Sequence, residues 1–456
     1  MFYILIAIYS LLFIGLSIKR QDLALYLTIF LLPTYLIRFQ VWFIPMTLLE
    51  VMILSLFCVW VFRMYRQKRK IDFSIYKFWL LLILIASAVS IIISPDKVVA
   101  LGIWKAYFIE PLMFYLVVVN TLQLKLLPRV GLALGASALM VSVPAIIQKF
   151  TGWWIANPFW AEEKTRRVVS WYGFPNAIGL YLAPIVVWST GLLVYWFARN
   201  KKVNKKNKIL VPIFYGLVIL LSVLAIVYAK SEGALIGLLA GVVFFGIFYP
   251  NKKIRSYTLV AIIVFMLLAS TISPIKEYVG DKLTLADRSG QIRIQQWKET
   301  ASMLADDGLI TGAGLSGYQE KVLPYHAEGI WIKDKRDPDW LSKVMFNEEF
   351  RVQAWQPTEI YMYPHNIILN FWSEVGLIGL LSFVGLIFKM FKNYFQINDL
   401  KNKKLYLLVL SVMVVILVHG LVDVPYFKND LSVFWWLVFA VSYLIYKQEK
   451  EQLKNL

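Results

Sequence analysis

One of the three histidines in this 456-residue chain stands where a proton acceptor could work. His365 follows Tyr363-Pro364 and begins a long apolar run, which predicts that it lies in the first turn of a membrane-spanning helix. Free N–H groups and the positive end of the helix dipole disfavour a charged imidazole there. The sequence therefore predicts a neutral His365 able to accept a proton, with a purely structural hydrogen bond as the equal alternative.

Basic residues occur beside aromatic and glycine-containing segments at the same membrane boundary. Arg166 and Arg167 precede Trp171 to Asn176, and Lys230 lies in a tight turn between two apolar runs. Arg288 and Arg293 flank the start of a predicted helix. Several such cations would hold a phosphate or pyrophosphate group at the depth of the lipid headgroups. For any one of them, ordinary headgroup contact is the simpler interpretation.

Other polar residues carry weaker signals. Lys105 and Glu110 lie in an apolar run, where they could pair or line a cavity. His419 and Asp423 are four residues apart and share one helix face. They could form a proton-handling pair or a structural hydrogen bond. Asp337-Pro338-Asp339 has the spacing of a metal-binding diacid, but Asp337 as a helix cap with Pro338 at the first helical position explains it better. We expect no metal and no cofactor.

The composition shows what must position these residues. Of the chain, 59% is hydrophobic and 16% charged, and its mean hydropathy is +0.64, too apolar for a protein that is water-soluble throughout. The net charge is +19, and the basic residues occur in short clusters between apolar runs. This pattern orients a protein in a membrane and does not indicate nucleic-acid binding. The single cysteine, Cys58, excludes an intrachain disulfide.

Apolar runs of roughly 20 residues, the length that crosses a bilayer, predict an all-α polytopic membrane protein with about 13 (12–14) transmembrane helices. The first run lacks the basic start and cleavage site of a signal peptide. The expected spans cover residues 2–17, 22–37, 42–62, 76–94, 101–120, 130–149, 177–198, 209–228, 233–249, 257–273, 365–388, 405–424 and 432–447.

Basic clusters at 63–70, 199–208, 252–255 and 389–404 fall on one side if the spans alternate, which predicts that this side is cytoplasmic. The connection 274–363 then lies outside, and its 14 acidic residues against 11 basic ones agree with this. Helical spacing at 294–304, glycines at 312, 314 and 317, and a second helix through Trp340 and Met345 predict that it is folded. We therefore expect an N-terminal transmembrane bundle at 1–273, an external helical loop at 274–363, and C-terminal transmembrane helices with a cytoplasmic tail at 364–456.

These segments, taken in order, resemble the O-antigen ligase and O-antigen polymerase family over residues 160–430. The stretch from Arg167 to Asn176 resembles the family's Arg followed nine residues later by Asn, and 293–315 resembles the opening of its external loop. His365-Asn366 with Glu374 is similar to its closing segment. The turn Ser231 to Ala234 departs from the pattern, because Glu232 stands where many members carry Arg.

The resemblance implies a metal-independent, inverting glycosyltransferase of the bacterial cytoplasmic (inner) membrane whose active site faces outside. Its donor would be a glycan on undecaprenyl pyrophosphate, its acceptor a glycan, lipid or protein, and its surroundings membrane lipids. Arg167 and Arg293, helped by Arg166, Lys230 and Arg288, would hold the pyrophosphate. His365 would be the base, and a set of polar residues would support it: Asn176, Asn366, Glu374 and Asp423.

Two other classes of protein fit the same spans. A lipid-linked glycan flippase or other transporter is suggested by the many spans and by Lys105 and Glu110, but it needs no folded external loop and would place charges along a midplane path. A non-catalytic scaffold leaves the positions of His365 and the arginines unexplained. The sequence does not separate ligase from polymerase. The loop tryptophans Trp331, Trp340 and Trp355 could stack on acceptor sugars or form the core of the loop.

Overall fold

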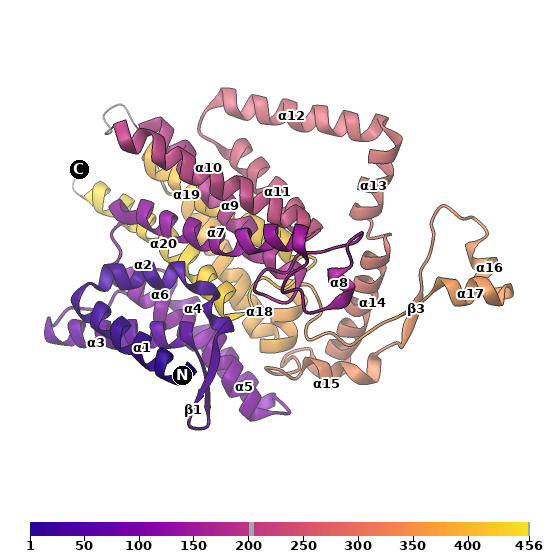
Figure 1. The fold of residues 1–456 in the computed structure, drawn as a ribbon, viewed down its shortest axis with the longest axis horizontal. Helices are drawn as coiled ribbons and strands as arrows, with labels where there is room; N and C mark the ends of the chain where they lie inside the picture. Colours follow the sequence, from indigo (N-terminus) through magenta and orange to yellow (C-terminus); the bar gives the residue numbers. More distant parts are fainter. Residues whose placement is uncertain (200–204, 455–456) are drawn as a thin grey trace.

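The computed structural model describes residues 1–199 and 205–454, and nearly all of its regular structure is helical (Figure 1). Its α-helices are α1 Phe2–Lys19, α2 Gln21–Phe30, α3 Leu48–Arg66, α4 Lys77–Ile93, α5 Lys97–Trp104, α6 Glu110–Thr121, α7 Leu127–Thr151, α8 Pro158–Ala161, α9 Pro175–Arg199, α10 Lys205–Tyr228, α11 Glu232–Phe248, α12 Lys252–Thr271, α13 Ser273–Leu283, α14 Arg288–Met303, α15 Tyr318–Val322, α16 Trp340–Phe346, α17 Glu348–Ala354, α18 Ile367–Tyr394, α19 Leu400–Gly420 and α20 Asn429–Lys454.

Short elements complete the chain. The 3-10 turns are η1 Leu32–Leu36, η3 Leu124–Leu126 and η5 Leu323–Tyr325, and the π-helical turns are η2 Lys105–Ile109 and η4 Leu304–Gly308. Two antiparallel hairpins pair β1 Arg38–Val41 with β2 Ile44–Thr47, and β3 Gly329–Trp331 with β4 Trp355–Pro357.

The chain is an all-α polytopic membrane protein, as predicted. Within the described residues, nine helical stretches are long and apolar enough to cross a membrane, and α4 and α11 are shorter apolar helices. The single span expected over 22–37 is wrong. The chain there forms the 10-residue α2 and then η1, where Pro33 lies at the start of the new turn and has no N–H to continue the first helix.

Three helices form the buried centre of the bundle. The most apolar windows of α9, α19 and α20 are 78%, 72% and 94% buried. Helix α11 packs on α19 at close range, because a side chain at Gly241 would lie 2.5 Å from Cγ2 of Val415. This close packing brings the start of α11 beside the end of α19, where the polar residues described below gather.

The segment 308–317 docks on a kink in α18. Gly376 has φ +70°, a conformation that side chains disfavour, and a Cβ there would lie 2.5 Å from the Ile310 carbonyl oxygen. The backbone groups that the kink frees are used: Leu377 N–H donates to Ile310 O at 2.9 Å, and Ala313 N–H donates to Ser373 O at 2.6 Å. The loop from 274 onward is thereby fastened to the membrane bundle.

Two expectations for the external segment hold, with a small shift. Helix α14 covers the predicted spacing from Ile294, and α16 covers Trp340 to Met345. The N-cap of α16 is Asp339 rather than Asp337, and Asp337 instead accepts two hydrogen bonds from Lys343 at 2.9 and 2.8 Å.

The basic clusters lie at one end of the bundle. Helix α3 ends at Arg66, α12 begins at Lys252, and α19 begins just before Lys401. Residues 200–204 of the cluster at 199–208 lie outside the described residues. Helices α9 and α11 begin, and α19 ends, at the opposite end of the bundle, next to α14 (Figure 1).

Candidate functional site

A cavity of about 320 Å³, here called the site cavity, opens at this opposite end. Residues from four segments line it: the segment before α9 with the first turn of that helix, the 230–236 turn and start of α11, the end of α13 with the start of α14, and the end of α19 with its following turn. Its lining residues are Arg167, Asn176, Lys230, Ser231, Glu232, Gly233, Ile236, Lys282, Leu285, Asp287, Ser289, Arg293, His419, Val422 and Asp423.

A chain of polar contacts crosses one wall of the site cavity. Arg167 Nη2 donates to Asn176 Oδ1 at 3.0 Å, and Asn176 Nδ2 donates to Asp423 Oδ2 at 3.1 Å. His419 Nε2 lies 3.9 Å from the same carboxylate oxygen. Arg167 Nε also donates to the Ala229 carbonyl at 2.9 Å, which ties it to the end of α10. The guanidinium is thus held in one orientation by groups that do not neutralise it.

Three helices begin at the site cavity. Asn176 lies in the first turn of α9, Glu232 is the first residue of α11, and Ser289 is the second residue of α14. The start of a helix carries unpaired N–H groups and a partial positive charge. The backbone therefore adds to the positive potential that the basic side chains create, a setting suited to a bound anion.

Of the cations that line the site cavity, Arg167, Arg293 and Lys230 have no carboxylate partner among the described residues. Arg293 Nη1 donates to Ser289 Oγ at 2.9 Å. Burial lowers the pKa of Arg167, and the charge of Arg293 acts in the same direction. Two guanidinium groups close enough to disfavour one another would both be stabilised by a shared anion.

Glu232 is neutralised by a residue that sequence reasoning missed. Lys282 Nζ lies 2.5 Å from Glu232 and 2.9 Å from Asp287, and Tyr278 O–H donates to Glu232 at 3.2 Å. Burial acts to lower the pKa of Lys282, but its two carboxylate partners raise it. Lys230, one of the residues expected to help hold the pyrophosphate, also lines the cavity, and its Nζ donates to the Thr165 carbonyl at 3.0 Å.

His365 lies just outside the helix that was expected to contain it. Asn366 is the N-cap of α18 and accepts from the N–H groups of Ile368 and Leu369, so His365 precedes the first turn. Its backbone has φ +43°, in the left-handed region. For a side-chain-bearing residue this costs roughly 1–3 kcal/mol, and such strain often accompanies functional sites.

Helix α14 holds the His365 segment in place. Trp297 Nε1 donates to Pro364 O at 2.9 Å, and Gln296 Nε2 donates to Tyr363 O at 3.5 Å. His365 Nδ1 lies 3.2 Å from Gln296 Oε1. Because that carbonyl oxygen can only accept, Nδ1 carries the proton, and Nε2 keeps its lone pair.

The protonation of His365 follows from its neighbours. Burial lowers its pKa below the ordinary value of 6.5; Asp423 opposes this shift, and Arg293 adds to it. A lowered pKa favours the neutral form of His365 at pH 7, and the causes are burial and Arg293 rather than a helix terminus. The electrostatic influence of Asp423 and Arg293 also couples His365 to the site cavity, which both of them line.

Two of the expected cations lie elsewhere. Arg166 does not line the site cavity; its Nε donates to Ala161 O at 3.1 Å and its Nη1 to Lys149 O at 3.0 Å, which brace the turn after α7. Arg288, the first residue of α14, is exposed and also outside the cavity lining. The neighbouring side chains at 166 and 167 thus have different partners, since Arg167 donates to Ala229 O and Asn176.

The remaining supporting residues connect elements. Asn366 Nδ2 donates to Leu421 O at 3.0 Å, which joins the start of α18 to the turn that carries Asp423. Glu374 is buried beside the α18 kink and accepts from the Ser316 N–H at 2.8 Å. Lys105 pairs with Glu50 at 3.1 Å, a partner that was not expected, and lies 3.9 Å from Glu110.

The signals that could have found the missed residues are weak. Lys282, Asp287 and Ser289 lie in the amphipathic segment 273–303 and have no distinctive spacing. Only the packing of α13 and α14 against the ends of α11 and α19 makes them part of the site. Across the described ranges 1–199 and 205–454, no three His, Cys, Asp or Glu side chains gather in a way that could hold a metal ion.

Comparison with known proteins adds one finding. The family model described as O-antigen ligase matches residues 217–384, which run from α10 through the external segment into α18. That range contains Lys230, Lys282, Arg293 and His365, but not Arg167 or Asp423. No curated protein matches the chain.

Proposed function

We propose that this chain, which its family match assigns to the O-antigen ligases, is a membrane glycosyltransferase that moves a glycan from undecaprenyl pyrophosphate to an acceptor hydroxyl or amine. The observation that carries the proposal is the convergence of Arg167, Arg293 and three helix starts on one cavity. The basic clusters at the far end of the bundle support an outward-facing cavity, and we infer that it lies at the outer face of the bacterial cytoplasmic membrane.

Pyrophosphate is a good leaving group once its charge is neutralised, so the enzyme mainly needs fixed positive groups around it. Arg167 is held by Asn176 and the Ala229 carbonyl, and Arg293 by Ser289, so neither side chain must reorganise when the anion enters. Lys230 adds positive charge in the cavity, and Lys282 neutralises the Glu232 carboxylate there. We assign the donor pyrophosphate to this set.

His365 supplies the base in this proposal. Its Nε2 lone pair takes the proton of the acceptor hydroxyl, and the acceptor oxygen forms a bond to the anomeric carbon. The bond from that carbon to the pyrophosphate oxygen breaks, and its electron pair leaves with undecaprenyl pyrophosphate. One displacement of this kind inverts the anomeric centre.

Purified protein in liposomes tests the proposal. Undecaprenyl-pyrophosphate glycan is the donor, a chelator is present, and wild type is compared with His365→Ala and Arg293→Ala. Lys298→Ala is the matched control, since Lys298 is exposed on α14 and does not line the cavity. We expect transfer by wild type and the control, and loss in the other two variants.

The product identifies the subclass. Growth by whole repeat units indicates a polymerase, and one glycan joined to an added acceptor indicates a ligase. Donor that crosses the bilayer unchanged, with no product under any acceptor, would replace the transferase proposal with the flippase alternative.

A further inference from the structure

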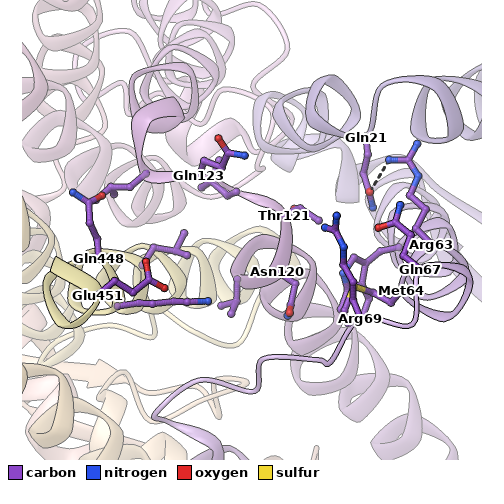
Figure 2. A pocket seen from close by; sticks show the side chains of 16 residues that line it. Gln21, Arg63, Met64, Gln67, Arg69, Asn120, Thr121, Gln123, Gln448 and Glu451 are labelled. Carbon is purple, nitrogen blue, oxygen red and sulfur yellow. Dashed lines mark hydrogen bonds between the residues drawn. The ribbon is translucent and has the colours of Figure 1, made fainter. Parts of the chain in front are cut away.

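A second cavity of about 540 Å³, here called the distal cavity, lies at the basic end of the bundle (Figure 2). The start of α2 and the ends of α3, α6 and α20 enclose it together with the segments that follow α3 and α6. Its lining residues are Gln21, Trp60, Arg63, Met64, Gln67, Arg69, Val119, Asn120, Thr121, Leu122, Gln123, Leu124, Leu444, Lys447, Gln448 and Glu451.

The distal cavity is far from the site cavity. Asp423 lies shortly before the start of α20, whereas Lys447 and Glu451 lie in its last turns. A helix rises about 1.5 Å per residue, so the two cavities are separated by about 30 Å along α20. The distal cavity thus belongs to the other membrane boundary, and the proposed transfer chemistry does not use it.

Two residues that line the distal cavity carry a buried hydrogen-bond donor without a partner. Gln21 is 7% exposed and Trp60 is 2% exposed, and neither Gln21 Nε2 nor Trp60 Nε1 has a hydrogen-bond acceptor among the described residues. Buried donors are nearly always paired in folded proteins because an unpaired one retains its full desolvation cost. Two in one cavity indicate a bound group that accepts hydrogen bonds.

The charges on this side of the cavity favour an anion. Arg63 Nη1 donates to Gln21 Oε1 at 3.1 Å, and its Nη2 donates to the Ile18 carbonyl at the end of α1. The Arg69 guanidinium has no partner within the structure's described ranges. Glu451 lies across the cavity from Gln21 and Arg63 in Figure 2, and Lys447 is already paired with Asp72 at 2.8 Å. The two arginines therefore make the side of the cavity next to the unpaired donors positively charged.

The distal cavity continues into an apolar groove. A neighbouring cavity of about 290 Å³ shares Gln21 and Arg63 with it and extends to Tyr26. From Tyr26, an open groove of about 490 Å³ runs between α2 and α7. The groove is lined by Leu16, Leu23, Tyr26, Leu27, Phe30, Arg129, Leu132, Ala133 and Ala136. Polar donors at one end and a hydrocarbon surface at the other match an amphipathic ligand.

We propose that the distal cavity and this groove bind a phosphate-bearing lipid of the leaflet next to the basic clusters. The phosphate oxygens accept from Arg63, Arg69, Gln21 Nε2 and Trp60 Nε1, and an acyl or prenyl chain lies along Leu23, Leu27 and Leu132. A soluble phosphate would use the donors but leave the groove uncovered, so the groove favours the lipid. The proposal is independent of the transferase activity.

Native mass spectrometry of the purified full-length protein, titrated with dioleoyl-phosphatidylglycerol, tests it. We expect Trp60→Phe combined with Arg69→Gln to weaken binding at least about tenfold, the order of effect of losing one charged hydrogen bond. Trp60→Phe keeps the aromatic packing and removes only the donor. Arg66→Gln is the matched control at the same end of α3, outside the cavity lining, and should bind as wild type does.

Further binding measurements distinguish a phosphate-bearing lipid from a soluble phosphate. Ala136→Trp fills the groove and should weaken the binding of phosphatidylglycerol without changing the binding of glycerol 3-phosphate. Dioleoylglycerol, which lacks phosphate, should bind wild type poorly. Glycerol 3-phosphate binding as tightly as the lipid would overturn the lipid assignment. Unchanged lipid binding by Arg69→Gln alone, an exposed position whose substitution leaves the fold intact, would overturn the site itself.

Discussion

Asn176 Nδ2 donates to Asp423 Oδ2 at 3.1 Å and joins two residues that are 247 positions apart in the sequence. The same amide accepts from Arg167 at 3.0 Å, so one side chain orients both a cation and a carboxylate of the site cavity. The start of α9 and the turn after α19 therefore act as one unit, and the orientation of Arg167 depends on a residue near the other end of the chain.

Asn176→Ala should lower kcat/KM for glycan transfer by about 10- to 100-fold, because Arg167 loses an acceptor and Asp423 loses a donor in a buried site. The protein should remain folded, since the backbone of α9 does not depend on this side chain. The liposome assay gives the rate, and thermal unfolding gives the stability. Activity equal to that of Lys298→Ala would show that the Arg167–Asn176–Asp423 contacts are not needed for transfer.

The acidic limb of the kcat/KM profile should lie below pH 6.5. Burial lowers the pKa of His365, and the base works only when neutral, so activity falls as the pH drops through that lowered pKa. Asp423 acts to raise this pKa, so Asp423→Asn should move the limb to still lower pH. Measurements of kcat/KM from pH 4 to 8 test both statements. If the acidic limb of the profile is unchanged in His365→Gln, the titrating group is not His365.

Lys282→Ala should raise the KM for the donor by about three- to tenfold, because it removes a cation and leaves the Glu232 carboxylate unpaired beside the pyrophosphate. The second substitution, Glu232→Gln, should recover most of the loss. A double-mutant cycle on KM measures this coupling. Additive effects would mean that the two side chains act on the donor separately.

Gly233→Ala should destabilise the protein by about 1–3 kcal/mol, the usual cost of an added methyl group in a filled space. A Cβ at Gly233 would lie 2.8 Å from His419 Cδ2 and 2.9 Å from Val422 Cγ2, both in the site wall. Gly216→Ala, inside α10 with nothing within 4 Å of the new atom, is the control and should be neutral or stabilising. Equal melting temperatures for the two variants would contradict the close approach of α11 to His419.

Much of the fold could be predicted because a bilayer imposes a length and a hydrophobicity on each crossing helix. The apolar runs at 130–149 and 177–198 correspond to α7 and α9, and the spacing from Ile294 corresponds to α14. The run at 22–37 shows the limit of this reasoning. Hydropathy does not register the break at Pro33, which ends one short helix and begins another turn.

The sequence by itself determined which residue types stand at the membrane boundary, because charged and polar side chains next to apolar runs are recognisable without coordinates. It singled out Arg167, Arg293 and His365 as candidates, and their roles remain predictions. Only the tertiary structure decided which cations share a cavity: it brought Lys282 to Glu232 and turned Arg166 toward Ala161. The physical reason is that a binding site depends on the relative placement of helix ends, which the packing of α11 on α19 and of α14 beside them sets, and no local pattern encodes that packing.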